Sequence, residues 1–251
     1  MYYAYCTDLM ARISGLLGKN EAQEQYTAQY QRIREAFAET YVMENGYMSQ
    51  DIQGAYVLGL HFDLIPEEKK ALAANRLKEL IVQNGGRLDT GFLATPVLLE
   101  TLWKHLGKQA AYEMLYQNRC PGWMYEIDRG ATTIWETWDG ISPSGRVGVM
   151  SYNHYAFGCV SEFMHQRIVG IRKLSPGYEQ ILICPEPDDT LTQASGSYNC
   201  VYGKIACSWK KEDGKFRLDA VIPCGARAVI RLPDGSEHRV GSGSYSYCVK
   251  L

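Results

Sequence analysis

The sequence predicts a multidomain α and β protein, with a helical part followed by a part built of strands. Up to about residue 173, apolar residues recur at spacings of three and four, which is the period of an amphipathic helix. After it they alternate with polar residues, which is the period of a half-buried strand. Ser175-Pro176-Gly177 separates the two patterns, so we expect a helical domain over residues 1–174 and a strand-rich domain over residues 175–251.

Seven helices are expected in the first domain. Terminal signals support several of them, such as Pro66 followed by two glutamates, or Thr95 as the cap before Pro96. Short connections favour antiparallel hairpins. A period near 40 residues would favour a helical solenoid, but the sequence shows no residue-level repeat, so a closed toroid of helix pairs is equally compatible. The expected ranges are residues 3–17, 21–40, 51–62, 66–83, 95–106, 108–118 and 155–171.

The second domain should contain at least five short strands. Asp213-Gly214 and Asp234-Gly235 are turn signals between neighbouring strands. Short strands joined by such turns predict an antiparallel β-sandwich. The alternating patterns cover residues 178–184, 200–209, 215–222, 226–232 and 245–249.

Composition narrows the functional classes. Of 251 residues, 46% are hydrophobic and 22% charged, which allows a sizeable core and excludes a disordered chain or a coiled coil. The net charge of -2 shows no basic surplus, so we expect no nucleic-acid partner. No uncharged apolar run approaches the ~20 residues of a membrane span, so we expect no membrane partner either.

The eight cysteines indicate a reducing compartment. They form no CxxC pair, and no paired histidines accompany them, so we expect no metal site. We interpret them as small buried hydrophobic residues with free thiols. Residues 1–6 lack the basic start and apolar stretch of a secretion signal, so we expect a cytoplasmic protein, with export the alternative if further sequence precedes residue 1.

One loop-like stretch, residues 119–158, differs from the rest in carrying indoles, acids and a histidine together. Loops on a rigid scaffold concentrate function, and indole faces with carboxylates are how proteins hold sugars. Core packing is the alternative for the indoles and for the histidine. The residues concerned are Trp123, Trp135, Glu136, Trp138, Asp139 and His154.

Three segments in this order resemble the bacterial α-L-rhamnosidases of glycoside hydrolase family 78. They are residues 89–96 (DTGFLATP), 130–140 (GATTIWETWDG) and 153–158 (NHYAFG). Residues 176–185 (PGYEQILICP) resemble the start of that family's C-terminal β-domain. The similarity extends over essentially the whole chain.

The resemblance implies a fold and a reaction. The family has an (α/α)6 barrel of twelve helices followed by a β-sandwich, so this chain would contribute a partial (α/α)6 toroid. The family cleaves terminal α-L-rhamnose with inversion and uses no cofactor or metal. Inversion needs two carboxyl groups on opposite faces of the sugar, ~6.5–9.5 Å apart.

The resemblance also implies roles for individual residues. Glu136 would be the general base and His154 would contact the sugar. One of Trp123, Trp135 and Trp138 would be a sugar platform, and Asp89 would shape or line the pocket. The alternative is a purely structural role for both, with Glu136 as an acid bonded to loop amides and His154 as a core histidine.

The family's general-acid motif (Asp-x-Pro-Gln-Arg-x-Glu-Arg-x-Gly-Trp-x-Gly-Asp) has no match in this sequence. With about seven helices rather than twelve, the chain resembles the C-terminal half of such an enzyme, carrying the general-base side. We expect the isolated chain to be inactive unless another carboxylate, such as Asp89 or Glu126, supplies the acid. We also expect either a homodimer or association with a missing N-terminal half.

Two functions of other classes remain as alternatives. A non-catalytic carbohydrate-binding or assembly fragment would bind L-rhamnose without hydrolysing a rhamnoside, whereas a helical scaffold for protein partners would do neither. On the enzyme hypothesis, the partner is a rhamnose-containing glycoside or oligosaccharide. Calorimetric titration with L-rhamnose and hydrolysis of a p-nitrophenyl rhamnoside separate the three.

Overall fold

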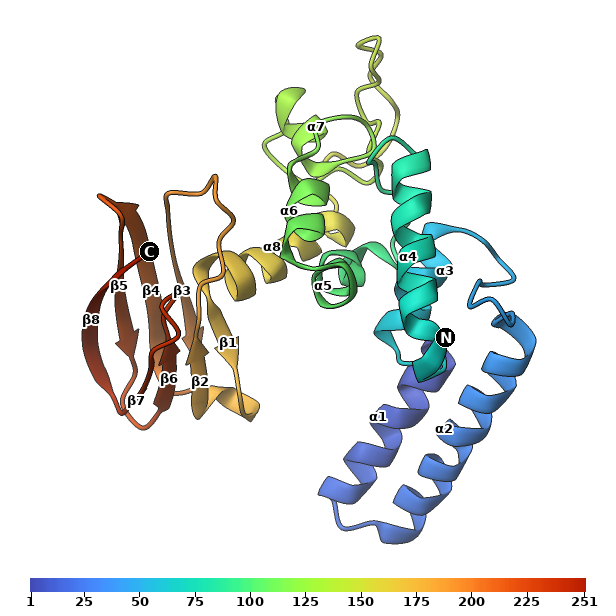
Figure 1. The fold of residues 1–251 in the computed structure, drawn as a ribbon, viewed down its shortest axis with the longest axis horizontal. Helices are drawn as coiled ribbons and strands as arrows, with labels where there is room; N and C mark the ends of the chain where they lie inside the picture. The colour runs from blue at the N-terminus through green and yellow to red at the C-terminus, as the bar shows by residue number, and fades with distance from the viewer. The chain divides into compact units, whose positions relative to one another are not determined.

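The computed structural model describes residues 1–251, which form two compact units, Met1–Gly158 and Cys159–Leu251 (Figure 1). The predicted boundary at residues 174/175 falls inside the second unit. The last helical residues contact the strands there, and the Trp209 indole N–H donates to the carbonyl of Ile168 at 2.7 Å. The helical tail is therefore part of the strand-rich unit.

The first unit contains seven α-helices, six of which lie within a few residues of the predicted ranges. The seventh, α7, lies in the stretch that we interpreted as loop. α1 with α2 and α3 with α4 form hairpins, whereas α5 and α6 meet at a sharp corner at Gly107, where φ is 91° (Figure 1). The helices are α1 (Tyr2–Leu16), α2 (Asn20–Tyr41), α3 (Gln53–His61), α4 (Glu67–Gln83), α5 (Thr95–Leu106), α6 (Lys108–Tyr116) and α7 (Trp123–Asp128).

The face that α1 buries is not its apolar stripe. Its buried residues are small, namely Ala4, Thr7, Ala11 and Ser14, and α1 makes its main helix contact with α2. Small side chains allow two helix backbones to approach closely. The apolar stripe that predicts this helix, including Leu16 and Leu17, is largely exposed.

The core of the first unit lies between α3, α4, α5 and α6. Burying a leucine or tyrosine side chain of this kind contributes roughly 1.5–3 kcal/mol. Thr95 is not the cap of α5 as predicted: it is the first helical residue, and its hydroxyl donates to the Thr90 carbonyl at 3.1 Å. The largest fully buried side chains of these four helices are Tyr56, Leu60, Leu77, Leu98, Leu102, Tyr112 and Met114.

Residues 156–171 do not form the single buried helix that we predicted. A 3-10 turn, η1 (Ala156–Cys159), leads into one turn of α-helix, α8 (Val160–Phe163), and then a π-helix, η2 (Met164–Val169). Gly170 ends it in the left-handed conformation (φ 88°, ψ 18°), and a strand begins at the next residue. Met164 is exposed, so the segment is only partly buried.

The second unit contains two four-stranded sheets, with strand orders β1-β2-β6-β7 and β3-β4-β5-β8. All five predicted strands are present, but β1, β3 and β7 were not predicted. One pairing departs from the expected antiparallel sandwich, because β2 runs parallel to β6, with Ile181 opposite Ala228. The strands are β1 (Ile171–Lys173), β2 (Gln180–Ile183), β3 (Gln193–Cys200), β4 (Gly203–Glu212), β5 (Lys215–Ile222), β6 (Arg227–Arg231), β7 (Glu237–Val240) and β8 (Gly243–Lys250).

The two sheets pack face to face as a sandwich. Buried and exposed residues alternate along β5. The ring of His238 in β7 stacks on the ring of Tyr247 in β8, with their centroids 4.4 Å apart. All the cysteines are free thiols, but only Cys207 is buried, so the predicted burial is wrong for most of them.

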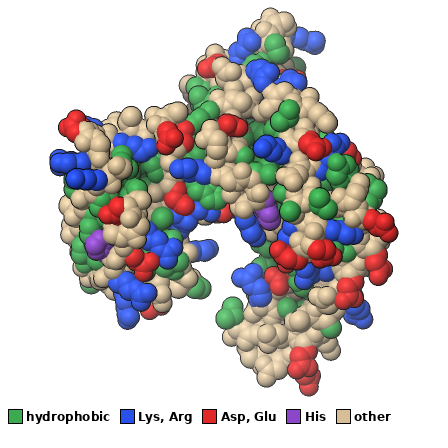
Figure 2. All heavy atoms as spheres, in the orientation of Figure 1, with side chains coloured by type: hydrophobic (Ala, Val, Ile, Leu, Met, Phe, Trp, Pro, Cys, Tyr) green, Lys and Arg blue, Asp and Glu red, His purple; other side chains and the backbone are tan.

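No helix combines the length and the apolar content that crossing a membrane demands. On the face drawn in Figure 2, acidic and basic side chains are interspersed.

Candidate functional site

Two loop segments that carry the motif residues lie side by side in the first unit. The His154 N–H donates to the carbonyl of Ile134 at 2.8 Å, and the Glu136 N–H donates to that of Ser151 at 2.9 Å. The Thr133 hydroxyl donates to the carbonyl of Tyr152. The structure therefore places Glu136 and His154 on two neighbouring segments, although eighteen positions separate them in the sequence.

Glu136 is half-buried, and one of its carboxylate oxygens is fixed. Oε2 accepts the Ser151 N–H at 2.9 Å, while Oε1 makes no hydrogen bond. A carboxylate held by one oxygen keeps its orientation and offers the other as an acceptor. That is the arrangement a general base needs in order to receive a proton from a water molecule.

His154 is held by its backbone, by one ring nitrogen and by two aromatic rings. Nδ1 accepts the Ala156 N–H at 3.2 Å, which assigns the proton of the neutral ring to Nε2. The imidazole stacks with Phe92 (centroids 5.2 Å apart) and with Tyr155 (5.1 Å). Nε2–H is thus a donor in a defined direction.

Phe92 and Tyr155 are site residues that the sequence alone did not single out. Both lie within the motif segments, and Tyr155 is 89% exposed. An exposed aromatic ring beside a polar donor can lie against the C–H face of a sugar. Their position in the motifs was the available signal, but nothing in the residue types distinguishes them from the core aromatic residues of the same segments.

All three predicted tryptophans are buried, with exposed fractions of 5% for Trp123, 3% for Trp135 and 9% for Trp138. Trp138 stacks on Phe157 at 3.8 Å and meets Trp123 edge-on at 5.3 Å. The Trp123 indole N–H donates to the Phe157 carbonyl at 2.9 Å. These are the contacts of a packed cluster beneath the loops, and the sugar platform predicted for one of these rings stays a prediction.

Asp89 is exposed at the start of a loop that leads to the site. Its backbone N–H donates to Gln53 Oε1 at 2.9 Å, and its carboxylate makes no hydrogen bond or ion pair. Three residues later, Phe92 reaches His154. The contact between this loop and the site is therefore made by Phe92 rather than by Asp89.

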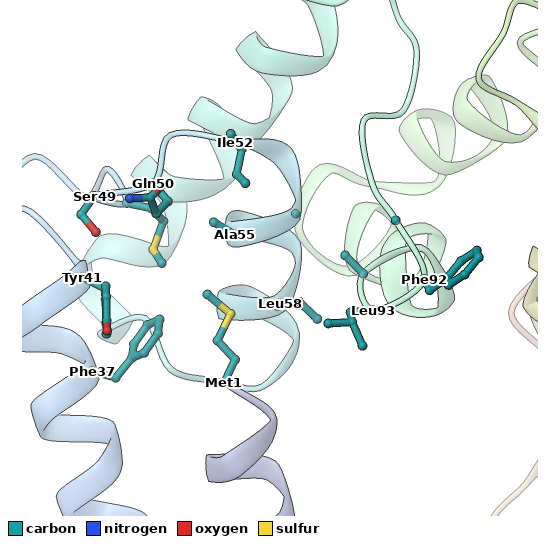
Figure 3. A pocket seen from close by; sticks show the side chains of 14 residues that line it. Met1, Phe37, Tyr41, Ser49, Gln50, Ile52, Ala55, Leu58, Phe92 and Leu93 are labelled. Carbon is teal, nitrogen blue, oxygen red and sulfur yellow. The ribbon is translucent and has the colours of Figure 1, made fainter. Parts of the chain in front are cut away.

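A mostly apolar cavity of about 630 Å³ lies on the other side of the same loop. Leu93 is directed toward it, whereas the Phe92 ring points away (Figure 3). Its other walls come from the end of α2, from α3 and from the turn between them, with Tyr41, Ser49 and Gln50 the polar residues. Residues 91–94 thus separate the cavity from the surroundings of His154.

Glu126 is a buried acid directly beneath the loop of Glu136. The residue is only 2% exposed, so its carboxyl group does not reach a sugar, and it is a poor candidate for a general acid. Burial raises the pKa of Glu126 to about 7, against the opposing effect of a hydrogen bond from the Trp135 N–H. A role for Glu126 must therefore act through the loop.

Comparison with known proteins decides the family. The model of the bacterial alpha-L-rhamnosidase 6 hairpin glycosidase domain matches residues 1–168, and that of the bacterial alpha-L-rhamnosidase C-terminal domain matches residues 170–246. The chain belongs to the bacterial α-L-rhamnosidase family. This confirms the resemblance, and it confirms the predicted order of a helical glycosidase part followed by a sheet domain.

Two curated relatives are each 39% identical to this α-L-rhamnosidase-family chain. The α-L-rhamnosidase of Streptomyces avermitilis aligns over 95% of this chain and 23% of its own length. That of Formosa agariphila aligns over 94% of this chain and 26% of its own length. The chain therefore spans about a quarter of the length of these relatives.

Solved structures of α-L-rhamnosidases also match this chain over nearly its whole length and over about a quarter of their own. The Streptomyces avermitilis α-L-rhamnosidase, complexed with L-rhamnose, matches with a TM-score of 0.93 and 37% identity over 99% of this chain and 26% of that one. An Aspergillus terreus α-L-rhamnosidase also has a TM-score of 0.93, at 36% identity, over 99% of this chain and 30% of that one.

Proposed function

We propose that this chain forms the general-base side of the active site of an inverting α-L-rhamnosidase, acting on a terminal α-L-rhamnose of a glycoside or oligosaccharide. Membership of the family supports the reaction class, and the Streptomyces avermitilis structural neighbour is complexed with L-rhamnose. The observation that carries the proposal is the Glu136 carboxylate, with Oε2 held by the Ser151 amide and Oε1 unpaired.

In this proposal Glu136 activates a water molecule. Oε1 takes a proton from the water as the water oxygen bonds to the anomeric carbon of rhamnose, and the glycosidic C–O bond breaks on the opposite face. A second carboxyl group protonates the departing oxygen. We assign no residue of this chain to that acid, because no segment matches the family's acid motif and Glu126 is buried.

His154 orients the sugar in this proposal. Its Nε2–H donates to a sugar hydroxyl, while Phe92 and Tyr155 hold the imidazole plane. The exposed ring of Tyr155 supplies an apolar surface beside that donor. Fixing a ring in this way reduces the entropy lost when the substrate binds.

The test is Glu136→Gln in a complete α-L-rhamnosidase. We expect kcat for a p-nitrophenyl α-L-rhamnoside to fall by ~10²–10⁴-fold, because general-base catalysis contributes that much. L-rhamnose affinity, measured by calorimetry, should change little, since the amide is nearly isosteric. Glu44→Gln, at an exposed acid of the same unit, is the matched control. A Glu136→Gln enzyme with a normal kcat would remove Glu136 from the reaction.

The same assays decide between this proposal and a carbohydrate-binding fragment. L-rhamnose binding with no hydrolysis in any protein that contains this chain would favour the fragment.

A further inference from the structure

Glu126 is attached to both ends of the segment that precedes Glu136. Its backbone carbonyl accepts the Ala131 N–H at 3.0 Å, and its side-chain Oε2 accepts the Trp135 N–H at 3.3 Å. Trp135 is the neighbour of Glu136 in the sequence. One residue of α7 therefore closes residues 131–135 into a loop, and the side-chain half of that closure acts next to the proposed base.

The other carboxyl oxygen of Glu126 is buried and has no hydrogen-bond partner. An ionised carboxylate here would carry its charge on an oxygen that neither water nor a protein donor reaches, which is costly. A neutral acid leaves only one O–H unpaired, while its carbonyl oxygen still accepts the Trp135 N–H. The geometry thus favours the neutral acid.

The groups around Glu126 do not supply a compensating cation. Burial raises the pKa of the Cys120 thiol, with Asp139 and Glu126 adding to the rise and Arg87 opposing it. Arg129, on the same helix, lies over the Tyr125 ring and donates to the Pro143 carbonyl. Burial raises the pKa of Glu126 to about 7, and the hydrogen bond from the Trp135 N–H opposes this rise.

We propose that Glu126 is a positioning residue, which as a neutral carboxylic acid holds the Trp135 amide and thereby fixes the orientation of Glu136. The proposal rests on the proposed role of Glu136 as the general base. The Trp135 hydrogen bond by itself favours an ionised Glu126, but desolvation of the carboxylate is the larger effect. Ionisation therefore draws the carboxylate toward water, releases the Trp135 amide and loosens the loop. The site accordingly works best while Glu126 keeps its proton.

Hydrogen exchange of the chain tests the hold on the loop. In Glu126→Ala at pH 6, peptides covering residues 131–136 should exchange about tenfold faster, because losing one hydrogen bond changes an opening equilibrium by about that factor. Glu126→Gln should remain protected, since its side-chain oxygen still accepts the Trp135 N–H. Asp128→Asn, an exposed acid on the same helix, is the matched control and should match wild type.

The pH dependence separates this role from mere packing. Relative to Glu126→Gln at the same pH, the wild-type loop should lose protection as the pH rises through about 7. In an active rhamnosidase, kcat of the wild type should fall more between pH 6 and 8.5 than kcat of Glu126→Gln, with KM little changed. Equal profiles for the two, or Gln exchanging as fast as Ala at pH 6, would overturn the inference.

The two proposals fail differently. If Glu126→Ala exchanges at the wild-type rate while Glu136→Gln loses turnover, the role of Glu126 is overturned and the proposed function stays intact. The expected exchange pattern, together with a normal kcat for Glu136→Gln in a complete enzyme, would support the hold of Glu126 on the loop and overturn the proposed function.

Discussion

At the scale of single residues, the contacts of His154 fix the orientation of its imidazole ring. Its Nδ1 is occupied by the Ala156 amide and its ring is stacked with two others, so only Nε2 is left for a ligand. Because such a contact forms in the ground state and strengthens in the transition state, its loss changes both kinetic parameters.

We therefore expect His154→Ala, in a complete rhamnosidase, to raise KM and lower kcat together. Each change should be about threefold, so that kcat/KM falls by about tenfold, the effect of losing one hydrogen bond of roughly 1.4 kcal/mol. Steady-state kinetics with a p-nitrophenyl rhamnoside measures both. His165→Ala, at a histidine of the second unit, is the control. If both parameters stay at wild-type values, His154 is only a packed loop residue.

The buried Glu126 also makes a prediction about stability. Its pKa is raised from 4.5 to about 7, so between these values the folded chain binds more protons than the unfolded chain. Its favourable contribution is complete below about pH 4.5 and is lost as the pH rises through about 7.

The free energy of unfolding of the wild type should therefore fall relative to that of Glu126→Gln, by up to roughly 3 kcal/mol, between pH 5 and pH 8. Urea denaturation of both proteins at the two pH values measures this difference. A constant difference would mean that Glu126 titrates as an ordinary surface acid.

At the scale of elements, Gly170 controls the passage from the π-helix η2 to strand β1. Its φ of 88° lies in the left-handed region, and an added Cβ would lie 2.3 Å from the Pro185 nitrogen. Its carbonyl accepts the Cys184 N–H at 2.8 Å, which joins this corner to the end of β2. Backbone of another segment occupies the space that a side chain would need.

Gly170→Ala should destabilise the second unit by about 2–4 kcal/mol, combining the left-handed conformation with the steric overlap. Urea denaturation followed by the fluorescence of Trp209, the only tryptophan of that unit, measures it. Gly241→Ala, where the added Cβ meets nothing within 4 Å, is the control and should change little. Equal stabilities of the two variants would show that the corner relaxes freely.

At the scale of the whole molecule, the outer face of α1 is the most conspicuous apolar surface. Leu16 is 88% exposed, and Ile13, Leu17 and Met10 are exposed on the same helix. Several exposed side chains of this size favour association, since burying each contributes ~1.5–3 kcal/mol.

We expect the 251-residue chain to self-associate in sedimentation experiments and to release no rhamnose from a p-nitrophenyl rhamnoside. Leu16→Glu with Leu17→Glu should weaken the association, whereas Val149→Glu, at an exposed loop residue, should not. A monomer that turns over substrate would contradict both halves of the expectation and would show that a carboxylate of this chain supplies the acid.

Local interactions explain what the sequence by itself determined. Helices α1 to α6 were predictable because their apolar periods and terminal residues act within a few turns, as at Asn84-Gly85-Gly86, which directly follows the last residue of α4. Hairpin turns such as Asp213-Gly214 were predictable because only certain residues adopt positive φ cheaply. The motifs named Glu136 and His154, whose roles stay predictions, and they indicated the family, which the comparisons confirm.

Only the tertiary structure decided how these residues are used. Which face of α1 is buried, the parallel pairing of β2 with β6, and the alignment of Ile134 and Glu136 with His154 and Ser151 all depend on contacts between distant segments. The burial of the three indoles and of Glu126 arises in the same way, because desolvation depends on everything that surrounds a side chain and not on its neighbours in sequence. A pattern of residue types carries information on local structure, but it lacks information on contacts between distant segments.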